Sequence, residues 1–435
     1  MTTPRHAPVP VPAARTTRTA RTPRAPQAGE RELDLSSAWA RGHNAVAEAQ
    51  LTPRLTDLGD AWRCHLHRGD GTGARGAGGS GRGTFQVALV GALYEALEHH
   101  HSHAAGLSSA ELVLRRPHEL AAGELADDPA VALLRHGPDT PMACRRHTAV
   151  SGPGALDVPL FLTCPSYLDI QAAELRERAG DGFEYTSVSR YSTNSGCAIG
   201  ATHTEALVHA LAEVVERDAF SLLLATTFLT ATPPPLRQVD PATLPADLAR
   251  LHSHAEQRLA RPVHLIDMTT DLGVPAYCAH VTSAGGRPAQ GQGASLSSEY
   301  AAHSALSELL QLCALRAADH RIPPDYRTLR HRPRLLAAGQ ADFDPHLRTA
   351  TTIPFTGTDA PLTPQEHAER LTARLGARGY TPYARTLRRA SNGVSTVSVF
   401  VPGLERFFAV TQGAAVIPGP RALSRARAHS HEGQG

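Results

Sequence analysis

The sequence predicts a mixed α/β fold in which helices pack on mixed sheets, and three observations support this prediction. Helical patterns, with apolar residues at i, i+3 and i+4, alternate with short apolar stretches typical of strands. Several of these helical patterns follow a glycine-bearing loop. The chain has 435 residues, of which 41% are hydrophobic, and this is enough to bury a large core.

Composition excludes several classes of protein. The 43 basic and 41 acidic residues almost balance, which argues against a nucleic-acid partner. No lysine occurs, so neither a lysine Schiff base nor a Walker-type phosphate loop can form. The six cysteines include no Cys-x-x-Cys pair, which suits a reducing cytoplasm. No membrane-spanning run and no secretory signal is found, so we expect a cytoplasmic protein without a membrane partner.

Three segments divide the chain. Residues 1–34 are basic and rich in Pro, Arg and Ala, and we expect a disordered tail because such a segment buries little surface. One large domain is expected over residues 35–425. Residues 426–435 are polar and are expected to form a second disordered tail.

The first elements are helical. A short helix is predicted over residues 35–50. Residues 68–83 are nearly all Gly, Arg, Ser, Ala, Asp and Thr, so we expect a flexible loop. A strongly periodic helix follows over residues 85–99 and carries Glu95 and Glu98 at i, i+3.

The central stretch is a polar loop, residues 192–200, followed by a helix from His203 to Ala219. We expect Thr204 to cap this helix. At about 100° per residue, Glu205 and Glu216 point in nearly the same direction, and Glu213 lies near them. A solvated face with Glu/Arg pairing is one explanation of these acids, but two other helices repeat the pattern.

The remaining elements are a mixture of strands and helices. Strands are predicted at residues 158–163, 262–268, 276–281 and 394–401. A glycine-rich loop, residues 285–293, precedes a third helix at residues 298–317, which carries Glu308 and Gln311. Residues 320–362 look irregular, and a last helix is predicted over residues 365–379.

Three loop-plus-helix units with acid or amide groups at i, i+3 are suited to holding divalent cations. Mg²⁺ takes oxygen ligands and usually keeps phosphate oxygens of a substrate among them. Converging carboxylates repel one another unless a cation lies between them. Arg82 and Arg217 could then hold phosphates. The residues alone therefore suggest a Mg²⁺-nucleotide site without a P-loop, provided that the three helices converge.

Several motifs in this order resemble those of the YcaO family over roughly residues 45–425. The most specific is Ser192-Thr193-Asn194, Gly200, Glu205-Ala206 and Glu213-x-x-Glu216-Arg217-Asp218-Ala219. Gly81-Arg82-Gly83 with Glu95-Ala-Leu-Glu98 forms a second motif, and Ala305-Leu-x-Glu308-x-x-Gln311 a third. The resemblance implies the fold of that family.

The resemblance also implies site residues. It assigns Mg²⁺ binding to Glu95, Glu98, Glu213 and Glu216. It assigns nucleotide contacts to Arg82, Gly91, Glu205, Arg217, Glu308 and Gln311. It assigns no side chain as the catalytic residue.

Enzymes of this family use ATP and Mg²⁺ to phosphorylate a backbone amide oxygen of a ribosomally made peptide after a nucleophile attacks the carbonyl. The resemblance implies azoline formation from Cys, Ser or Thr as the main expectation, and thioamide or amidine formation as alternatives. It also implies a precursor peptide, a separate E1-like leader-binding or TfuA-like partner, and a homodimer.

Several positions depart from the family pattern, among them His99, where arginine often stands, and the C-terminus, where the Pro-x-Pro-x-Pro of many azoline-forming members is absent. Arg82 stands in place of lysine, Gly91 in place of serine and Ser304 in place of arginine. These changes favour a second hypothesis, in which the chain is a non-catalytic scaffold for a partner. The retained carboxylates and Arg217 favour the enzyme.

Overall fold

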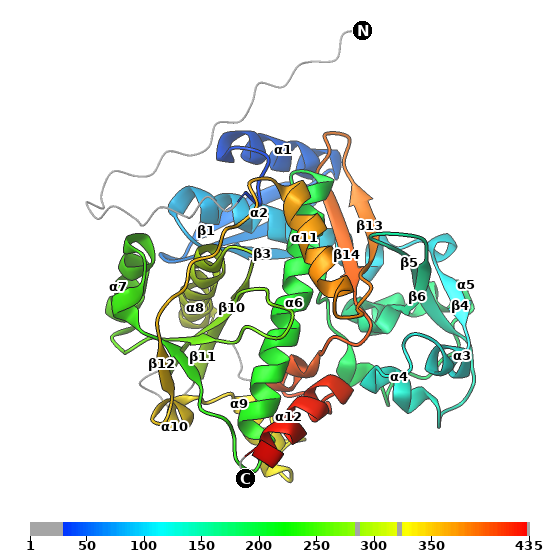
Figure 1. Cartoon of the computed structure of the whole chain (residues 1–435). Helices are drawn as coiled ribbons and strands as arrows, with labels where there is room; N and C mark the ends of the chain where they lie inside the picture. The colour runs from blue at the N-terminus through cyan, green and yellow to red at the C-terminus, as the bar shows by residue number, and fades with distance from the viewer. Residues whose placement is uncertain (1–28, 283–287, 320–323, 433–435) are drawn as a thin grey trace.

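A long helix, α6 (His203–Phe228), runs through the middle of the molecule (Figure 1). The structure is a computed structural model and describes residues 29–282, 288–319 and 324–432. The side chain of Thr202 caps α6 by accepting a hydrogen bond from the Glu205 N–H at 3.2 Å. The prediction of Thr204 as the cap was wrong, because Thr202 has the extended backbone that a cap requires.

The strands of the described residues form three sheets, each of which packs against a helix of the site. The first, antiparallel, has the order β1-β2-β3: β1 (Thr52–Asp57), β2 (Trp62–His67) and β3 (Gly73–Gly81). The second has the order β11-β10-β9-β8-β12: β8 (Arg237–Val239), β9 (His264–Asp267), β10 (Ala276–Thr282), β11 (Pro288–Ala294) and β12 (Thr351–Ile353). The third has the order β4-β5-β13-β14-β7, with β6 paired to β5: β4 (Val113–Arg115), β5 (Met142–Ala149), β6 (Ala155–Pro159), β7 (Cys197–Gly200), β13 (Tyr383–Arg389) and β14 (Ser395–Phe400).

The other helices surround these sheets and α6 (Figure 1). Toward the N-terminus they are α1 (Leu35–Glu48), α2 (Phe85–Ser102), α3 (Pro117–Ala122), α4 (Pro129–Leu134), α5 (Ala173–Ala179) and α7 (Ala246–Leu259). Toward the C-terminus they are α8 (Ser298–Asp319), α9 (Pro333–Gln340), α10 (Asp344–Leu347), α11 (Pro364–Gly376) and α12 (Pro420–Glu432). The mixed α/β class predicted from the sequence is confirmed.

The two glycine-rich segments predicted to be loops are strands, and this is the main correction to the sequence analysis. Residues 68–83 contain β3, and the described part of residues 285–293 lies in β11. Their glycines let a helix backbone approach closely: a Cβ on Gly81 would lie 1.6 Å from the Ala88 carbonyl oxygen of α2, and one on Gly291 would lie 2.2 Å from the Ala305 oxygen of α8. Glycine therefore serves helix–sheet packing here and not loop flexibility.

A third glycine completes the same arrangement at α6. A Cβ on Gly200, at the end of β7, would lie 2.5 Å from the backbone nitrogen of Ala206. In each of the pairs α2/β3, α6/β7 and α8/β11, a strand glycine thus lies against the backbone of the helix. They are the three units in which the sequence analysis found acidic and amide side chains.

Other boundaries also differ from the predictions. The predicted strand 158–163 ends at Pro159, and a 3₁₀ turn, Leu160–Leu162, follows. Residues 320–362, predicted to be irregular, contain α9, α10 and β12 within their described part. The predicted helices at residues 35–50, 85–99, 298–317 and 365–379 and the strands at residues 262–268, 276–281 and 394–401 are confirmed, with small shifts of their ends.

The packed structure extends into both segments that the sequence analysis predicted to be disordered tails. Residues 1–28 lie outside the described residues, but Glu30 is only 3% exposed, so the packed structure begins before residue 35. At the other end, α12 continues to Glu432, and most of the predicted tail at residues 426–435 is therefore helical.

Candidate functional site

A cavity of about 630 Å³ lies where two of the three helix units meet. Helix α6 contributes Glu213 and Arg217 to its wall, α8 contributes Glu308, and β11 contributes Gln292. The polar loop at residues 192–195, which carries the first residues of the central motif, lines another side. The sequence-predicted residues of α6 and α8 are therefore brought together, although Glu213 and Glu308 are 95 positions apart.

On α6, Arg217 lies between two acids. Its Nε is 3.7 Å from Glu213 Oε1, and one of its terminal nitrogens is 3.6 Å from Glu216 Oε1. The same guanidinium donates to Gln292 at 3.2 Å. Burial raises the pKa of Glu216 to about 7, which Arg217 opposes, and burial also raises the pKa of Glu213.

On α2, the two predicted metal ligands face other parts of the site. Glu95 accepts a hydrogen bond from the Ser80 N–H at 2.8 Å, and Glu98 accepts one from the Ile199 N–H at 3.1 Å. Burial raises the pKa of both carboxyls, and for Glu98 the charges of Glu213 and Glu95 raise it further. Glu98 is thus close enough to Glu213 and to Glu95 for their charges to disfavour its ionised form, so α2 and α6 approach each other at Glu98.

Helix α8 contacts β3 and Arg82, the residue that follows this strand. Arg82 forms an ion pair with Glu308 at 2.5 Å. Gln311 donates from its amide to the Ser80 carbonyl oxygen at 2.8 Å. These two contacts join α8 to the strand that packs on α2, and they place Arg82, Glu308 and Gln311 within the same region.

Gly91 lies apart from these contacts. A Cβ at this position would be 3.5 Å from Gly81 Cα, so Gly91 faces β3. Ser304, on α8, lies against Gly293 of β11, 2.8 Å from where a Cβ of that glycine would stand. Gly91 and Ser304, two of the departures from the family pattern, therefore lie at helix–strand contacts.

Glu205 is held by backbone and by a residue that the sequence analysis missed. Its two carboxylate oxygens accept hydrogen bonds from the Ala201 N–H at 2.9 Å and from the Glu32 N–H at 2.6 Å. The Arg31 guanidinium lies 3.8 Å from the same carboxylate. The segment before residue 35 thus supplies a third arginine to this region.

Glu30 fixes that segment. It accepts a hydrogen bond from Ser295 and lies 3.8 Å from both His209 of α6 and His367 of α11. Burial raises the pKa of Glu30 to about 7. A signal was present in the sequence, because Glu30 is the first acidic residue of the chain and marks the end of the purely basic composition.

The donor set suits Mg²⁺ held jointly by protein and phosphate. Among the described residues, the four predicted ligands do not form a group of three whose ligand atoms all lie within 4.8 Å. Mg²⁺ needs only one or two carboxylates when phosphate oxygens and water complete its shell. Carboxylates with raised pKa values beside Arg82 and Arg217 fit this arrangement, because a cation would relieve their repulsion.

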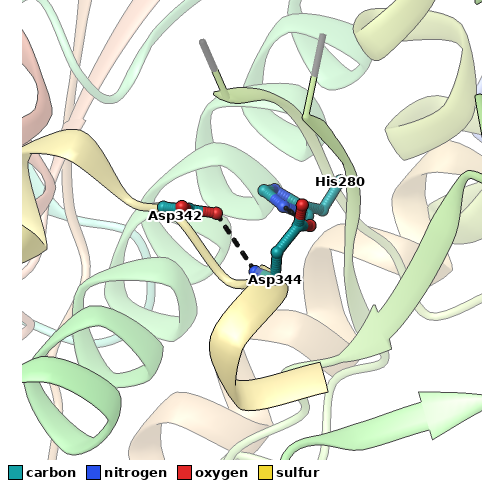
Figure 2. A group of neighbouring side chains, drawn as sticks. All are labelled: His280, Asp342 and Asp344. Atoms are coloured by element: carbon teal, nitrogen blue, oxygen red, sulfur yellow. Dashed lines mark hydrogen bonds and ion pairs between the residues drawn. The ribbon is translucent and has the colours of Figure 1, made fainter. Parts of the chain in front are cut away.

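A second cluster, His280, Asp342 and Asp344, does bring three such atoms within 4.8 Å (Figure 2). His280 Nε2 lies 3.1 Å from Asp344, and the Gln290 amide nitrogen, fixed by its 2.7 Å bond to the Ala341 oxygen, lies 3.4 Å from His280 Nδ1. The arrangement suits the tautomer in which Nδ1 accepts from Gln290 and Nε2–H donates to Asp344. Both ring nitrogens of His280 thus have hydrogen-bond partners within the chain, and the cluster joins β10 to the α9–α10 turn.

Within the described part of the chain, every helix is too short or too polar to cross a membrane. The model of the YcaO family, described as ATP- and Mg²⁺-binding cyclodehydratases, matches residues 78–405. A protein of Rhizobium leguminosarum bv. trifolii, named as uncharacterized in the tfuA 3′ region, is 35% identical over 100 residues. That match covers 22% of this chain and 21% of that protein.

Solved structures share the fold. The YcaO of Methanopyrus kandleri bound with AMPPCP and Mg²⁺ has 18% identity and a TM-score of 0.60, covering 89% of this chain and 95% of that one. A heterocyclase in complex with substrate and cofactor has 17% identity and a TM-score of 0.57, covering 88% of this chain but only 54% of that one. The E. coli microcin synthetase McbBCD complex with pro-MccB17 bound has 14% identity and a TM-score of 0.54, covering 82% and 88%.

Proposed function

The chain belongs to the YcaO family, and we propose that it uses ATP and Mg²⁺ to modify the backbone of a ribosomally made precursor peptide. Azoline formation from Cys, Ser or Thr is the proposed outcome. The observation that carries the proposal is the cavity at which α6 and α8 place Glu213, Arg217 and Glu308 together, with Glu98 of α2 close enough to Glu213 for that charge to add to burial in raising the pKa of Glu98. Carboxylates held in this way are suited to binding a cation.

The side chains then have separate roles. Glu95, Glu98, Glu213 and Glu216 are the carboxylates that would hold Mg²⁺, together with phosphate oxygens and water. ATP bound there supplies the phosphoryl group that makes an amide oxygen a good leaving group.

Arginines surround the same space. Arg217 and Arg82 are already beside carboxylates, and each can turn a free N–H toward a phosphate oxygen when nucleotide binds. Arg31 adds a third guanidinium beside Glu205. These arginines compensate in charge for the lysine that the family motif has and this chain lacks.

The wall of the cavity beyond Arg217 is suited to a peptide. The loop at residues 192–195, Gln412 and Thr411 offer hydroxyl and amide groups, and Phe408 and Tyr326 offer apolar surface. Such a mixture can pair with a peptide backbone while excluding water around the reacting carbonyl. A precursor peptide, with an E1-like or TfuA-like partner to deliver it, is part of this proposal.

The test is calorimetric titration of the purified chain with Mg²⁺ and a non-hydrolysable ATP analogue. We expect binding by the wild type and a loss of affinity of at least tenfold in Glu216→Gln, which should still show a cooperative melting transition. The control is Glu177→Gln on α5, an exposed glutamate, which should bind like the wild type. No binding by the wild type at millimolar analogue would defeat the proposal and favour the scaffold hypothesis.

A thioamide is the second candidate, favoured by the relative from a tfuA region. Mass spectrometry separates the two outcomes after incubation with ATP and precursor peptides encoded by neighbouring genes. Loss of one water per modified residue indicates an azoline. Replacement of oxygen by sulfur, dependent on sulfide and a TfuA-like protein, indicates a thioamide.

A further inference from the structure

A buried ion pair joins the C-terminal helix to the residue that follows Arg217. Asp218 is 0% exposed, and both of its carboxylate oxygens accept from Arg421 of α12, at 3.0 and 3.1 Å. Burial raises the pKa of Asp218, and Arg421 opposes this rise. A buried carboxylate needs such a partner to stay ionised, so α12 is fixed to α6 at this point.

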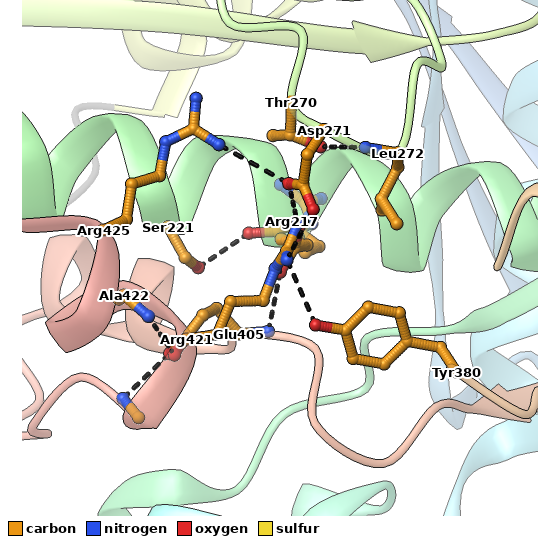
Figure 3. Close-up of polar contacts among 12 residues, drawn as sticks. Arg217, Ser221, Thr270, Asp271, Leu272, Tyr380, Glu405, Arg421, Ala422 and Arg425 are labelled. Carbon is orange, nitrogen blue, oxygen red and sulfur yellow. Dashed lines mark hydrogen bonds and ion pairs between the residues drawn. The ribbon is translucent and has the colours of Figure 1, made fainter. Parts of the chain in front are cut away.

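Arg421 also has partners outside α6 (Figure 3). It donates to Asp271, in the turn between β9 and β10, at 2.7 Å, and to the Tyr380 hydroxyl at 3.1 Å. Its guanidinium carbon lies 5.3 Å from the centre of the Tyr380 ring. One arginine therefore holds three separate segments together, with a planar geometry that lysine cannot reproduce.

The same carboxylate positions the chain that lines the cavity. Asp218 accepts a further hydrogen bond from the Glu405 N–H at 3.0 Å. The Glu405 side chain in turn accepts from the N–H groups of Gly419 and Ala422, at 2.9 and 2.8 Å, at the start of α12. Both ends of the segment from Glu405 to Ala422 are thus fixed beside Asp218.

Phe408, near the start of this segment, reaches Arg217 in two ways. Its N–H donates to the Ser221 hydroxyl at 2.9 Å, and that hydroxyl donates to the Arg217 carbonyl oxygen at 2.6 Å. The Arg217 guanidinium carbon lies 5.2 Å from the centre of the Phe408 ring. Contact with this ring restricts the directions in which the guanidinium can point.

We propose that Arg421 is a positioning residue for Arg217: through Asp218 and the Glu405–Phe408 segment, it holds the Arg217 guanidinium in the orientation that binds nucleotide phosphate. The inference rests on the proposed nucleotide site. Arg421 is not one of the residues that line the cavity, and its hydrogen bonds are to Asp218, Asp271 and Tyr380, so we expect its effect on affinity to pass through Asp218 and the segment that follows Glu405.

The matched control for Arg421 is Arg425, one turn further along α12. Arg425 lies 3.5 Å from Asp271, a partner that it shares with Arg421. We expect Arg421→Ala to weaken binding of the Mg²⁺-ATP analogue about tenfold, and Arg425→Ala less than twofold. Equal affinities of Arg421→Ala and the wild type would overturn the inference while leaving the proposed nucleotide site intact. No binding by the wild type would defeat both.

A double-mutant cycle with Phe408→Leu separates positioning from general loosening of the fold. If Arg421 acts through Phe408, then Arg421→Ala should change the affinity less than threefold in the Phe408→Leu background. A tenfold effect in both backgrounds would contradict the inference, because the two residues would then act independently.

If Arg421→Ala fails to fold, the affinity of Arg421→Lys is compared with that of the wild type instead. The lysine ammonium still neutralises Asp218. Lysine cannot contact both oxygens of Asp218 and also reach Asp271 and Tyr380. We expect a dissociation constant between those of the wild type and Phe408→Leu, with Arg425→Lys unchanged. An affinity of Arg421→Lys equal to that of the wild type would then reject the inference.

Discussion

The Arg31 guanidinium lies 3.8 Å from the Glu205 carboxylate and thereby joins the N-terminal segment to the helix that carries the central motif. The backbone N–H of the next residue, Glu32, donates to the other oxygen of that carboxylate at 2.6 Å. Glu205 is only 1% exposed, whereas about half of the Arg31 side chain is exposed. Glu205 therefore acts as the anchor, and about half of the Arg31 side chain stays accessible to a ligand.

Replacing Arg31 by alanine tests whether this guanidinium contacts phosphate. A charge-assisted hydrogen bond contributes about 1.5–3 kcal/mol, so we expect Arg31→Ala to bind the Mg²⁺-ATP analogue at least tenfold more weakly in calorimetric titration. Glu32→Ala is the control, because it keeps the backbone N–H that bonds to Glu205. Tighter binding by Arg31→Ala would contradict the expectation and indicate that Arg31 competes with the nucleotide.

The pKa of Glu216, raised by burial to about 7, predicts a pH dependence of stability without Mg²⁺. Between about pH 4.5 and 7 the folded protein keeps a proton on this carboxyl that the unfolded chain has released. The free energy of unfolding therefore falls as the pH rises through this window. Glutamine at this position cannot ionise and resembles the protonated acid, so Glu216→Gln should not show this fall.

Several buried histidines, among them His209 and His303, have lowered pKa values. Their contribution to the free energy of unfolding rises with pH, opposite to that of Glu216. The quantity to measure is therefore the difference in unfolding free energy between Glu216→Gln and the wild type, from urea titrations without Mg²⁺. We expect the variant to gain about 1–3 kcal/mol relative to the wild type between pH 5 and pH 8. A constant difference would show that the carboxyl has no raised pKa.

The amphipathic helices could be predicted from the sequence, because their periodicity reflects burial on one face. This applies to α2, α6 and α8 and to the spacing of Glu95 and Glu98 or of Glu213 and Glu216. Periodicity gives the direction of a side chain relative to its own helix. It does not show that Glu98 meets Glu213 across two helices, because this depends on how β3 and β7 align the helices.

The strands β3 and β11 were missed for a physical reason. Strand propensity comes mainly from side chains that pack on a pleated surface, and Gly79, Gly81, Gly291 and Gly293 have none. These glycines are needed because a helix backbone lies against each of them, a relationship between segments that local sequence does not reveal. Arg31 was missed because the composition of residues 1–34 hid the short segment that packs.

Replacing Glu98 by glutamine tests the metal assignment on α2. A ligand present at 100 times its dissociation constant stabilises a folded protein by about 2.7 kcal/mol. We expect Mg²⁺ with the ATP analogue to raise the melting temperature of the wild type, and the same concentrations to give no rise in Glu98→Gln. Glu111→Gln is the control, because Glu111 pairs with Arg385 and Arg388 on another part of the surface. An undiminished rise in Glu98→Gln would remove Glu98 from the metal site.

Two glycines that face each other across α2 and β3 should respond in opposite ways to alanine. A Cβ on Gly81 would lie 1.6 Å from the Ala88 oxygen, so Gly81→Ala must push the helix away from the strand. We expect a loss of about 3 kcal/mol or more in the free energy of unfolding, measured with urea. A Cβ on Gly91 would lie 3.5 Å from Gly81 Cα, an ordinary contact, and Gly91→Ala should gain up to about 1 kcal/mol from helix propensity.

The same two substitutions, Gly81→Ala and Gly91→Ala, separate effects on the stability of the fold from effects on the nucleotide site. Ser80, beside Gly81, bonds to both Glu95 and Gln311, so displacing β3 also displaces a metal ligand and a contact of α8. Gly81→Ala should therefore lose affinity for the Mg²⁺-ATP analogue as well as stability, whereas Gly91→Ala should keep its affinity. A loss of affinity in Gly91→Ala without a loss of stability would indicate that this position contacts the nucleotide, as the sequence resemblance predicted and the packing against β3 argues against.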